Sequence, residues 1–468
     1  MTRQFWDKRF HCQTKGSRPK VRSCCGIEKV IVDLWNHCVI HEVMTSAPLL
    51  SSEWEDALSS LPATLDLDHT AVKFGALKRR REISSGKDLL RLAFAYGPCG
   101  MSLRSTAAWA CMTGLGKLSD VAILNRLRGA TQWLEYIATE LLADTSRADF
   151  PSGYRLRLVD GTTVSAPGSK GTDFKIHASY DPATARFAHL EISDGHGAEC
   201  LTRNLVNPGE IHIADRGYAF AKGLHPIISN GGDFIVRTGW RKFRLFHPDG
   251  SRLDLFSVLT EATNATPIDR LVIIQGRSKA YDVPARLIAI RKPPAAIEQE
   301  KKRLRRISSK KGSKLTPKSL IAAEYMLLVT SLPKEDFNTA SVADLYRLRW
   351  QIELAFKRLK SILHIDRLPA KDPALAKSWL LAHLILALLI ERKSEDLLAH
   401  APEEESKQSW NPSTWRIYKL LRQSLISAIQ GVCDMSSVIH HGHTFWRTIW
   451  EPPRRRKRQQ IPRLPSLS

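Results

Sequence analysis

Residues 345–360 read LYRLRWQIELAFKRLK and combine the periodicity of an amphipathic helix with four chemically active side chains at fixed spacing. Apolar residues recur every three or four positions, which is typical of a helix that packs on a core. The active side chains follow the spacing Y-x2-R-x3-E-x6-K, and in one helix they fall within roughly 60° of one another. They are Tyr346, Arg349, Glu353 and Lys360. The stretch therefore predicts a single helix whose polar stripe borders its buried face.

The polar stripe of this helix has two interpretations. Glu353 stands between Arg349 and Lys360 in the stripe, so it could be a metal ligand flanked by cations that bind phosphate. The alternative is a salt-bridged surface that faces solvent, because Glu with Arg or Lys at this spacing is common in helices. The rest of the chain has to distinguish a catalytic face from an ordinary exposed one.

The composition favours a polyanionic partner. The 468 residues include 70 Lys or Arg against 47 Asp or Glu, which gives a formal net charge of +23 and a pI near 9.8. With 43% hydrophobic residues the chain is globular, and it is long enough for two or three domains. Nucleic acid is the commonest partner of so basic a protein.

A membrane partner is not expected. The most apolar stretch, WLLAHLILALLIE at 379–391, is shorter than the about 18 residues needed to span a bilayer, and it predicts a buried helix. The N-terminal residues lack the apolar core of a signal peptide. We therefore expect a cytoplasmic protein.

The cysteines do not indicate a disulfide framework, since eight thiols in a chain of this length would be reduced inside a cell. Four of them lie in residues 1–43, close to several histidines, which raises the alternative of a zinc site. The paired C-x-x-C spacing of structural zinc sites is missing. We therefore predict that residues 1–43 form a poorly ordered extension, with Met44 as a second candidate start.

Residues 44–150 carry helix periodicity and predict a helical DNA-binding domain. Ser102 and Ser119 stand at N-cap positions, and a glycine-containing turn separates the two helices that they begin. The second helix is expected to run unbroken over 119–142. Such a pair is either a DNA-binding helix-turn-helix or part of a plain helical bundle.

Four consecutive cations precede this helix pair: Lys78, Arg79, Arg80 and Arg81. They contact DNA if the adjacent helices bind in a groove, and otherwise they form a solvated loop. Arg79, Arg80 and Arg81 are therefore candidate DNA-binding residues.

From residue 154 the sequence takes on the pattern of strands. The segments YRLRLVDG, FKIHASYD, ARFAHLEISD, GEIHIADRGY and GDFIVRTGW predict strands between short helices or loops, and so an α/β core. Asp160 closes the apolar run LRLVD, and Asp215 closes IHIAD. An Asp at a strand end often only begins a turn. Together with a helix that presents Glu353, the two could instead hold two divalent ions for phosphodiester chemistry.

Three separate segments resemble one known family. VDGTTV around Asp160, IADRGY around Asp215 and the spacing Y-x2-R-x3-E-x6-K are similar to the DDE transposases of bacterial insertion sequences, in particular the insertion-sequence-four family. The order Asp, Asp, Glu matches as well. The similarity extends from TAVKFGALKRRREI near the start to LPAKDPALAKSWLLAHLILALL after the signature.

The resemblance implies an α/β fold with a ribonuclease H-like catalytic core interrupted by a β-rich insertion, between a helical N-terminal domain and a helical C-terminal region. The core would occupy 151–239 and 336–400, and the insertion with its basic arm would occupy 240–335. The implied catalytic residues are also the implied ligands of two Mg²⁺ (or Mn²⁺) ions. They are Asp160, Asp215 and Glu353.

The resemblance also gives other residues candidate roles. Tyr346, Arg349 and Lys360 would contact the DNA backbone near the transposon end, where Arg can grip a phosphate with two hydrogen bonds and Lys adds a point charge. Trp240, at the start of the insertion, would stack a base flipped from the transposon end, unless it is a buried core residue. His177 could approach the scissile phosphate, unless it is an ordinary strand histidine.

Two basic segments complete the chain. Residues 301–318 carry nine Lys or Arg, and they predict an arm that follows DNA phosphates by counterion release. The alternative for this segment is a charged helix that runs into a flexible loop. Residues 401–468 predict a further helix and a proline-bracketed basic tail.

The resemblance predicts a DNA transposase that binds the inverted-repeat ends of its element, cleaves the phosphodiester and joins the freed 3′ ends to target DNA. We expect a homodimer in the DNA complex and association with the nucleoid. A structure-selective nuclease on the same fold and an inactive, transposase-derived DNA-binding protein are the alternatives. All three acidic residues are present, which argues against decay.

Overall fold

The computed structural model describes residues 49–143, 154–260, 266–399 and 413–431. The chain divides into two units, Met1–Ser52 and Glu53–Ser468, and all described residues except 49–52 belong to the second unit. The predicted extension at 1–43, with its alternative zinc site, and the predicted basic tail lie outside the described residues.

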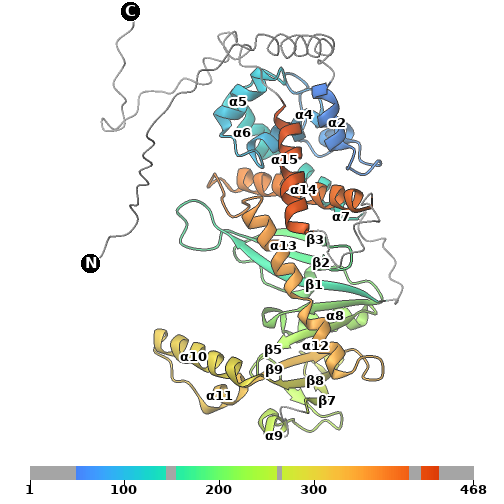
Figure 1. Cartoon of the computed structure of the whole chain (residues 1–468), viewed down its shortest axis with the longest axis vertical. Helices are drawn as coiled ribbons and strands as arrows, with labels where there is room; N and C mark the ends of the chain where they lie inside the picture. The colour runs from blue at the N-terminus through green and yellow to red at the C-terminus, as the bar shows by residue number, and fades with distance from the viewer. Residues whose placement is uncertain (1–48, 144–153, 261–265, 400–412, 432–468) are drawn as a thin grey trace, which may run out of the picture. The chain divides into compact units, whose positions relative to one another are not determined.

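The first part of the described chain is helical (Figure 1). Its helices are α2 (Leu49–Leu58), α3 (Leu67–Lys73), α4 (Gly86–Tyr96), α5 (Leu103–Met112), α6 (Asp120–Gly129) and α7 (Thr131–Ala143). Both predicted N-caps are confirmed. The Ser102 hydroxyl accepts the N–H of Ser105 at the start of α5, and the Ser119 hydroxyl accepts the N–H of Ala122 at the start of α6.

The prediction of one unbroken helix over 119–142 is wrong. The chain ends α6 at Gly129 and begins α7 at Thr131. Between them, the N–H of Ala130 donates to the carbonyl of Leu127, three positions back, over 3.2 Å. Glycine has a low helix propensity, so Gly129 favours a break at this point.

A nine-stranded mixed sheet follows in the described part of the chain, with the order β3-β2-β1-β4-β5-β9-β8-β7-β6 (Figure 1). The strands are β1 (Arg155–Val164), β2 (Phe174–Asp181), β3 (Arg186–Asp194), β4 (Glu210–Ala214), β5 (Asp233–Thr238), β6 (Leu245–Phe246), β7 (Ile268–Ile274), β8 (Val283–Arg291) and β9 (Tyr325–Thr330). The mixed α/β class and all five strands predicted between 154 and 240 are confirmed.

Parallel and antiparallel pairing meet in this sheet. β1, β4 and β5 are parallel neighbours, with Val159 opposite Ala214 and Ile213 opposite Ile235. β2 and β3 extend the sheet beyond β1 as antiparallel strands. Beyond β5, the antiparallel strands β9, β8, β7 and β6 follow in turn. The strands predicted for the insertion therefore continue the sheet that carries the two aspartates.

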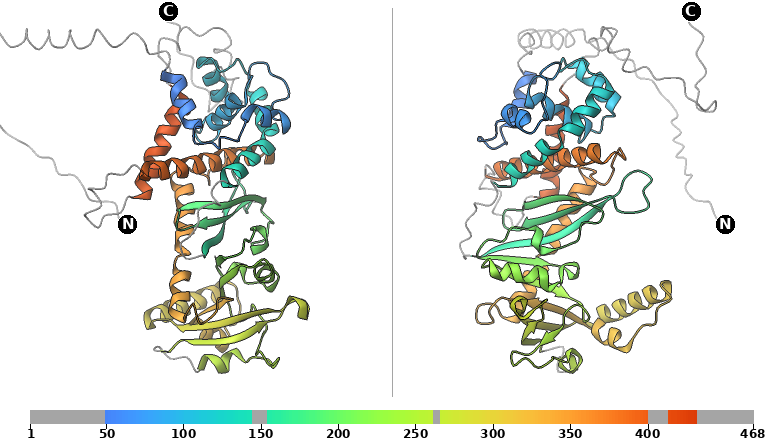
Figure 2. Two further views of the ribbon diagram at one scale, coloured as in Figure 1. Left: turned by 90° about the vertical axis from the view of Figure 1, so that its right-hand side faces the viewer. Right: turned by 180° about the vertical axis from the view of Figure 1, so that it is seen from behind.

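The remaining helices alternate with these strands and follow them. They are η2 (Leu201–Arg203), η3 (Arg216–Tyr218), α8 (Ala221–Ser229), α9 (Leu255–Thr260), η4 (Lys279–Tyr281), α10 (Pro294–Lys310), α11 (Pro317–Ala323), α12 (Thr339–Arg347), α13 (Trp350–Ser361), α14 (Pro373–Ala399) and α15 (Thr414–Gln430). α13 runs alongside the sheet and contacts β1 and β2 (Figure 2).

The long helix α14 belongs to the larger of two apolar cores. By length and composition it could cross a membrane, but 83% of its most apolar window is buried inside the protein. It contacts α4, α6, α7 and α15. The buried helix predicted at 379–391 is therefore confirmed as a core helix, and it is longer than predicted at both ends.

Candidate active site

The two aspartates lie where the parallel pairing of β1 with β4 ends. Val159 opposes Ala214 in the last pair of that ladder, so Asp160 and Asp215 follow side by side. Asp215 leaves its strand directly before η3, as predicted. The prediction that Asp160 also closes a strand is wrong. β1 continues to Val164 because the residues after Asp160 still pair with β2.

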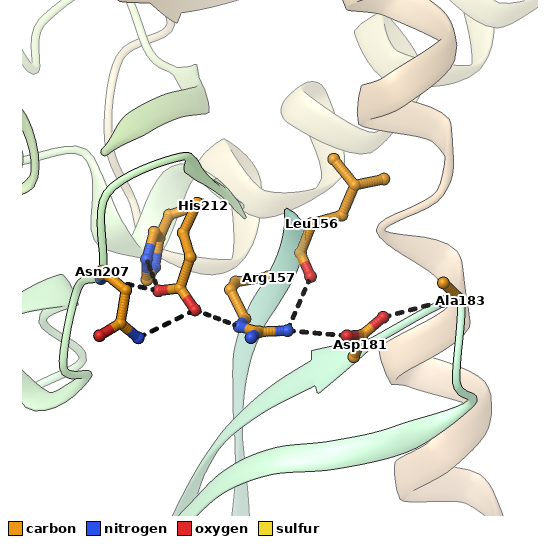
Figure 3. Close-up of polar contacts among 7 residues, drawn as sticks. Leu156, Arg157, Asp181, Ala183, Asn207 and His212 are labelled. Carbon is orange, nitrogen blue, oxygen red and sulfur yellow. Dashed lines mark hydrogen bonds and ion pairs between the residues drawn. The ribbon is translucent and has the colours of Figure 1, made fainter. Parts of the chain in front are cut away.

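A buried ion cluster fixes the register of these strands three residues before the aspartates (Figure 3). Arg157 Nε donates to Glu210 Oε1 over 2.8 Å, and its Nη1 donates to Asp181 Oδ2 over 2.8 Å. His212, the register partner of Arg157, lies 3.4 Å from the second Glu210 oxygen. Burial acts to raise the pKa of Glu210, but its contacts with His212 and Arg157 outweigh burial and lower the pKa to about 2. The ionised cluster ties β1, β2 and β4 together.

The four signature residues come from two helices and the turn between them. At the junction of α12 and α13, the N–H groups of Arg349 and Ile352 donate to carbonyls three positions back, over 3.1 and 3.2 Å. Such bonds make a 3₁₀-type turn that interrupts the α-helix. The single helix predicted over 345–360 is therefore wrong, and Tyr346 lies on a different helix from Glu353.

The polar side chains of this region nevertheless meet at the aspartates. The hydroxyl of Tyr346 donates to Oδ1 of Asp215 over 3.2 Å. Arg349 Nη1 lies 3.5 Å from Oδ2 of Asp160, and Arg349 Nη2 donates to Oε1 of Glu353. Two of the three predicted carboxylates therefore share one guanidinium, and the third accepts a hydrogen bond from the tyrosine. An exposed salt-bridged surface does not describe this face, because the Arg349 side chain is only 14% exposed.

Burial has different outcomes at the two aspartates. It raises the pKa of Asp160 to about 6, although the charge of Arg349 favours the ionised form. Burial also acts to raise the pKa of Asp215, but the Arg216 N–H and the charge of Arg237 outweigh it and lower the pKa. Asp160 is thus the aspartate whose charge is compensated less well, and an added cation would stabilise its ionised form.

The donor set suits a hard divalent cation. Asp160, Asp215 and Glu353 offer only carboxylate oxygens, the ligands that Mg²⁺ and Mn²⁺ prefer. Within the described ranges, no group of three His, Cys, Asp or Glu side chains is already spaced to hold an ion. Arg349 instead supplies positive charge between Asp160 and Glu353. The three carboxylates therefore match the ligands that a divalent ion prefers. Asp160 and Glu353 would have to release Arg349 before they could bind such an ion.

The structure does not bring the other predicted phosphate-binding residues to the carboxylates. The ammonium group of Lys360, in the last turn of α13, makes no hydrogen bond or ion pair with any residue that the structure describes. Arg79, Arg80 and Arg81 are exposed in the loop between α3 and α4. Their contact with DNA stays a prediction.

Trp240, which follows β5 in the chain, lines a pocket of aromatic and cationic side chains. Its ring lies edge-on to Phe256 with 5.3 Å between the centroids, and the Arg241 guanidinium lies 4.2 Å from the Trp240 centroid. Arg252 and Lys318 line the same pocket. Trp240 packs on the smaller apolar core but is only partly buried, so one side of it borders the pocket.

His177 lies on β2, opposite Gly161 and next to the register partner of Asp160. Its Nε2 is hydrogen-bonded to the Ser193 hydroxyl over 2.8 Å, whereas its Nδ1 is buried with no hydrogen-bond partner among the described residues. Burial lowers the pKa of the imidazole to about 4, so the ring is neutral at pH 7. Nε2 is therefore bonded as in an ordinary strand histidine, whereas Nδ1 is left without a hydrogen bond from the described residues.

Sequence reasoning missed two residues beside the aspartates. Arg237 Nη1 lies 3.7 Å from Asp215 Oδ1. The sequence feature that could have identified Arg237 is a cation inside the apolar strand FIVRT. The Tyr218 hydroxyl is buried with no hydrogen-bond partner among the described residues. Burial and the charge of Asp160 both raise its pKa. Its signal was its place in the motif IADRGY.

Comparison with known proteins shows the family to which this chain belongs. Residues 151–389 match the family model described as "Transposase DDE domain". The chain is 42% identical over 364 residues to the transposase for insertion sequence element IS421 of Escherichia coli. These residues cover 76% of this chain and 98% of that protein. InsL of insertion sequence element IS186A, from Escherichia coli (strain K12), is 42% identical over 363 residues with the same coverage. The transposase for IS231B of Bacillus thuringiensis subsp. berliner is 23% identical over 343 residues, which are 64% of this chain and 70% of that protein. The chain therefore belongs to the DDE transposases of bacterial insertion sequences, in the insertion-sequence-four family.

Proposed function

We propose that this chain is a transposase that binds the inverted-repeat ends of its element, cleaves phosphodiester bonds with two divalent metal ions and joins the 3′ ends to target DNA. The observation that carries the proposal is the convergence of Asp160, Asp215 and Glu353 on Arg349 and Tyr346. Membership of the family supports a DNA-cleaving and DNA-joining enzyme. The parallel strands that carry the two aspartates support a ribonuclease H-like core.

The three carboxylates would hold the ions. Two Mg²⁺ or Mn²⁺ ions would activate a water or a 3′ hydroxyl and stabilise the charge on the leaving oxygen. The protein's own contribution is position: β1 and β4 place Asp160 and Asp215 directly after the last pair of their hydrogen-bonded ladder, and α13 carries Glu353. Fixed positions for the reacting groups remove much of the entropic barrier of such a reaction.

Arg349 and Tyr346 would change partners when DNA enters the site. In the protein alone, Arg349 is paired with two carboxylates and Tyr346 with a third. Asp160 and Glu353 would then hold ions in place of Arg349, whose guanidinium fork could grip a phosphate with two hydrogen bonds. Lys360 lies on the helix that carries Glu353, where its ammonium group would add a mobile charge.

Recognition of the element ends is assigned to the helical N-terminal domain. The pair α5 and α6 would enter the groove, and Arg79, Arg80 and Arg81 would contact phosphates nearby. Their exposure supports this assignment. Trp240 would stack a base taken out of the transposon end, and the aromatic and cationic lining of its pocket supports that role.

The test is a strand-transfer assay with a labelled element end and Mg²⁺ or Mn²⁺. We expect the parent to join DNA, and we expect Asp160→Asn, Asp215→Asn and Glu353→Gln each to abolish cleavage while they retain binding to the end. Cleavage without joining would indicate a nuclease, and binding without cleavage by the parent would indicate an inactive descendant. A near-normal rate in any of the three variants would refute the ligand assignment.

A further inference from the structure

A strongly cationic pocket lies between β5 and α10. One side of it is formed by Arg237 on β5 and Lys292 after β8, and the other side by α10. The residues of α10 that carry its polar lining are Gln299, Glu300, Lys302, Arg303 and Arg306.

The pocket is lined by one face of α10. Gln299, Arg303 and Arg306 follow the spacing i, i+4, i+7, which places them on one side of a helix. Lys301 belongs to another face, where it is paired with Glu324 over 2.8 Å. The basic run predicted as one arm is therefore divided: part of it is neutralised within the protein, and part of it faces the pocket.

The pocket carries a large excess of positive charge. Five cations line it, and Glu300 is the single carboxylate in its lining. That carboxylate is already engaged, since both of its oxygens accept hydrogen bonds of 2.9 Å from Arg303. Burial lowers the pKa of Lys292; the charge of Glu300 acts to raise it, and the charges of Arg237 and Arg303 lower it further. Cations held together with so little counter-charge repel one another, and an anionic ligand would relieve the repulsion.

Arg237 connects this pocket to the candidate active site. The same guanidinium that lines the pocket lies 3.7 Å from Oδ1 of Asp215. An anion in the pocket would therefore lie close to a phosphodiester bound at the carboxylates. A chain of regularly spaced anions, such as a DNA strand, can reach both places at once, whereas a single small anion cannot.

We propose that this pocket binds the sugar-phosphate backbone of the DNA strand that is cut, at phosphates adjacent to the scissile one. The inference rests on the proposed function, and it adds a second phosphate site on α10 to the site at the carboxylates. Arg303 and Arg306 would grip the phosphates through their guanidinium forks, and the Gln299 amide would donate to a phosphate oxygen. Glu300 holds Arg303 in the absence of DNA and opposes binding.

The first test compares Arg303→Gln/Arg306→Gln with the control Arg305→Gln, which changes the same helix outside the pocket lining. Binding of a fluorescent duplex that carries one element end is measured by anisotropy at several salt concentrations, with chelator present to prevent cleavage. We expect the double variant to bind about tenfold or more weakly, with the slope of log affinity against log salt reduced by about 2. The control should stay within about threefold of the parent.

Glu300→Gln should change the affinity for the duplex in the opposite direction. It removes the carboxylate that competes for Arg303, so we expect tighter binding than in the parent by about threefold or more, with a steeper salt slope. This gain cannot come from a folding defect. Unchanged or weaker binding by Glu300→Gln would contradict the proposal.

Duplexes with a single neutral methylphosphonate locate the contact. The parent should lose affinity when a phosphate next to the scissile one is neutralised, and the double variant should be insensitive at that position. If the parent cleaves and joins DNA but the double variant keeps its affinity and salt slope, the pocket assignment is wrong and the proposed function stands. If the parent binds through the pocket but does not cleave, the pocket assignment stands and the proposed function fails.

Discussion

The hydroxyl of Tyr346 donates a hydrogen bond of 3.2 Å to Oδ1 of Asp215, although 131 positions separate the two residues. The bond joins the end of a central strand to α12, the helix before the one that carries Glu353. It therefore holds the carboxylate on the sheet and the helical pair in one arrangement.

Tyr346→Phe removes this bond and little else. We expect the rate of DNA cleavage to fall about tenfold, because Asp215 loses a donor that orients it, while the free energy of unfolding falls by only about 1 kcal/mol. Single-turnover cleavage and thermal melting on the same preparations measure both quantities. Tyr281→Phe, at an exposed tyrosine, is the control. A cleavage rate within twofold of the parent would exclude a role for the bond in catalysis.

Substitution of Trp240 tests the aromatic pocket. Base stacking on an aromatic side chain contributes about 1–3 kcal/mol, so Trp240→Ala should slow cleavage about tenfold and Trp240→Phe should slow it less. A 2-aminopurine placed at the terminal positions of the element end should brighten when the parent binds, because the base leaves the stack, and Trp240→Ala should alter this signal. Leu271→Ala, at an exposed residue of β7, is the control. Equal rates for Ala and Phe would show that the ring has no stacking role.

The ion cluster of Figure 3 predicts a large stability effect. Arg157→Ala leaves Asp181 and Glu210 buried without their shared cation, so the free energy of unfolding should fall by about 3–5 kcal/mol. Arg347→Ala removes an exposed ion pair with Asp344 and should cost less than about 1 kcal/mol. Urea denaturation of both variants gives the comparison. Similar losses in the two would mean that the cluster does not hold the strands.

Glu391 predicts how stability depends on pH. This residue of α14 is buried, one of its oxygens accepts the N–H of Phe187 over 3.0 Å, and the other has no partner among the described residues. Burial raises its pKa from 4.5 to about 7. The folded chain thus holds a proton that the unfolded chain releases, so the contribution of Glu391 to stability is present below pH 4.5 and is lost as the pH rises to about 7.

Glu391→Gln keeps an acceptor for Phe187 and removes the titration. We expect the variant to be more stable than the parent at pH 8 by an amount on the order of 3 kcal/mol, and the difference to shrink as the pH falls towards 4.5. Melting temperatures of the two proteins across this range measure the effect. Parallel pH profiles would show that Glu391 does not titrate on unfolding.

Local pattern predicted the strands and helices well because each depends on neighbours in sequence. The strand FKIHASYD and the N-caps at Ser102 and Ser119 lie where the periodicity and the capping chemistry place them. The three carboxylates could be named because two apolar runs end in Asp and because the spacing around Glu353 resembles the family signature. What local pattern could not supply was the pairing between distant strands.

The errors follow from contacts between distant parts of the chain. The turn between α12 and α13 lies where Tyr346 reaches Asp215 and Arg349 reaches Asp160, and the sequence around it reads as an unbroken helix. Arg237 was missed because its importance comes from β5 lying next to β4. That β6 to β9 join the main sheet could not be predicted either. The antiparallel pair between β5 and β9 that joins them links residues nearly a hundred positions apart.

The place of α13 in the chain has a consequence for synthesis. A ribosome releases both sheet aspartates well before Glu353, which is residue 353 of 468, and it releases the core helix α14 later still. The third carboxylate and the helix that completes the larger core are therefore among the last described parts to be made. A chain that stops before Glu353 would carry Asp160 and Asp215 without the third carboxylate. Interrupted translation would therefore yield products that lack both the third carboxylate and the helix that packs on α4, α6 and α7.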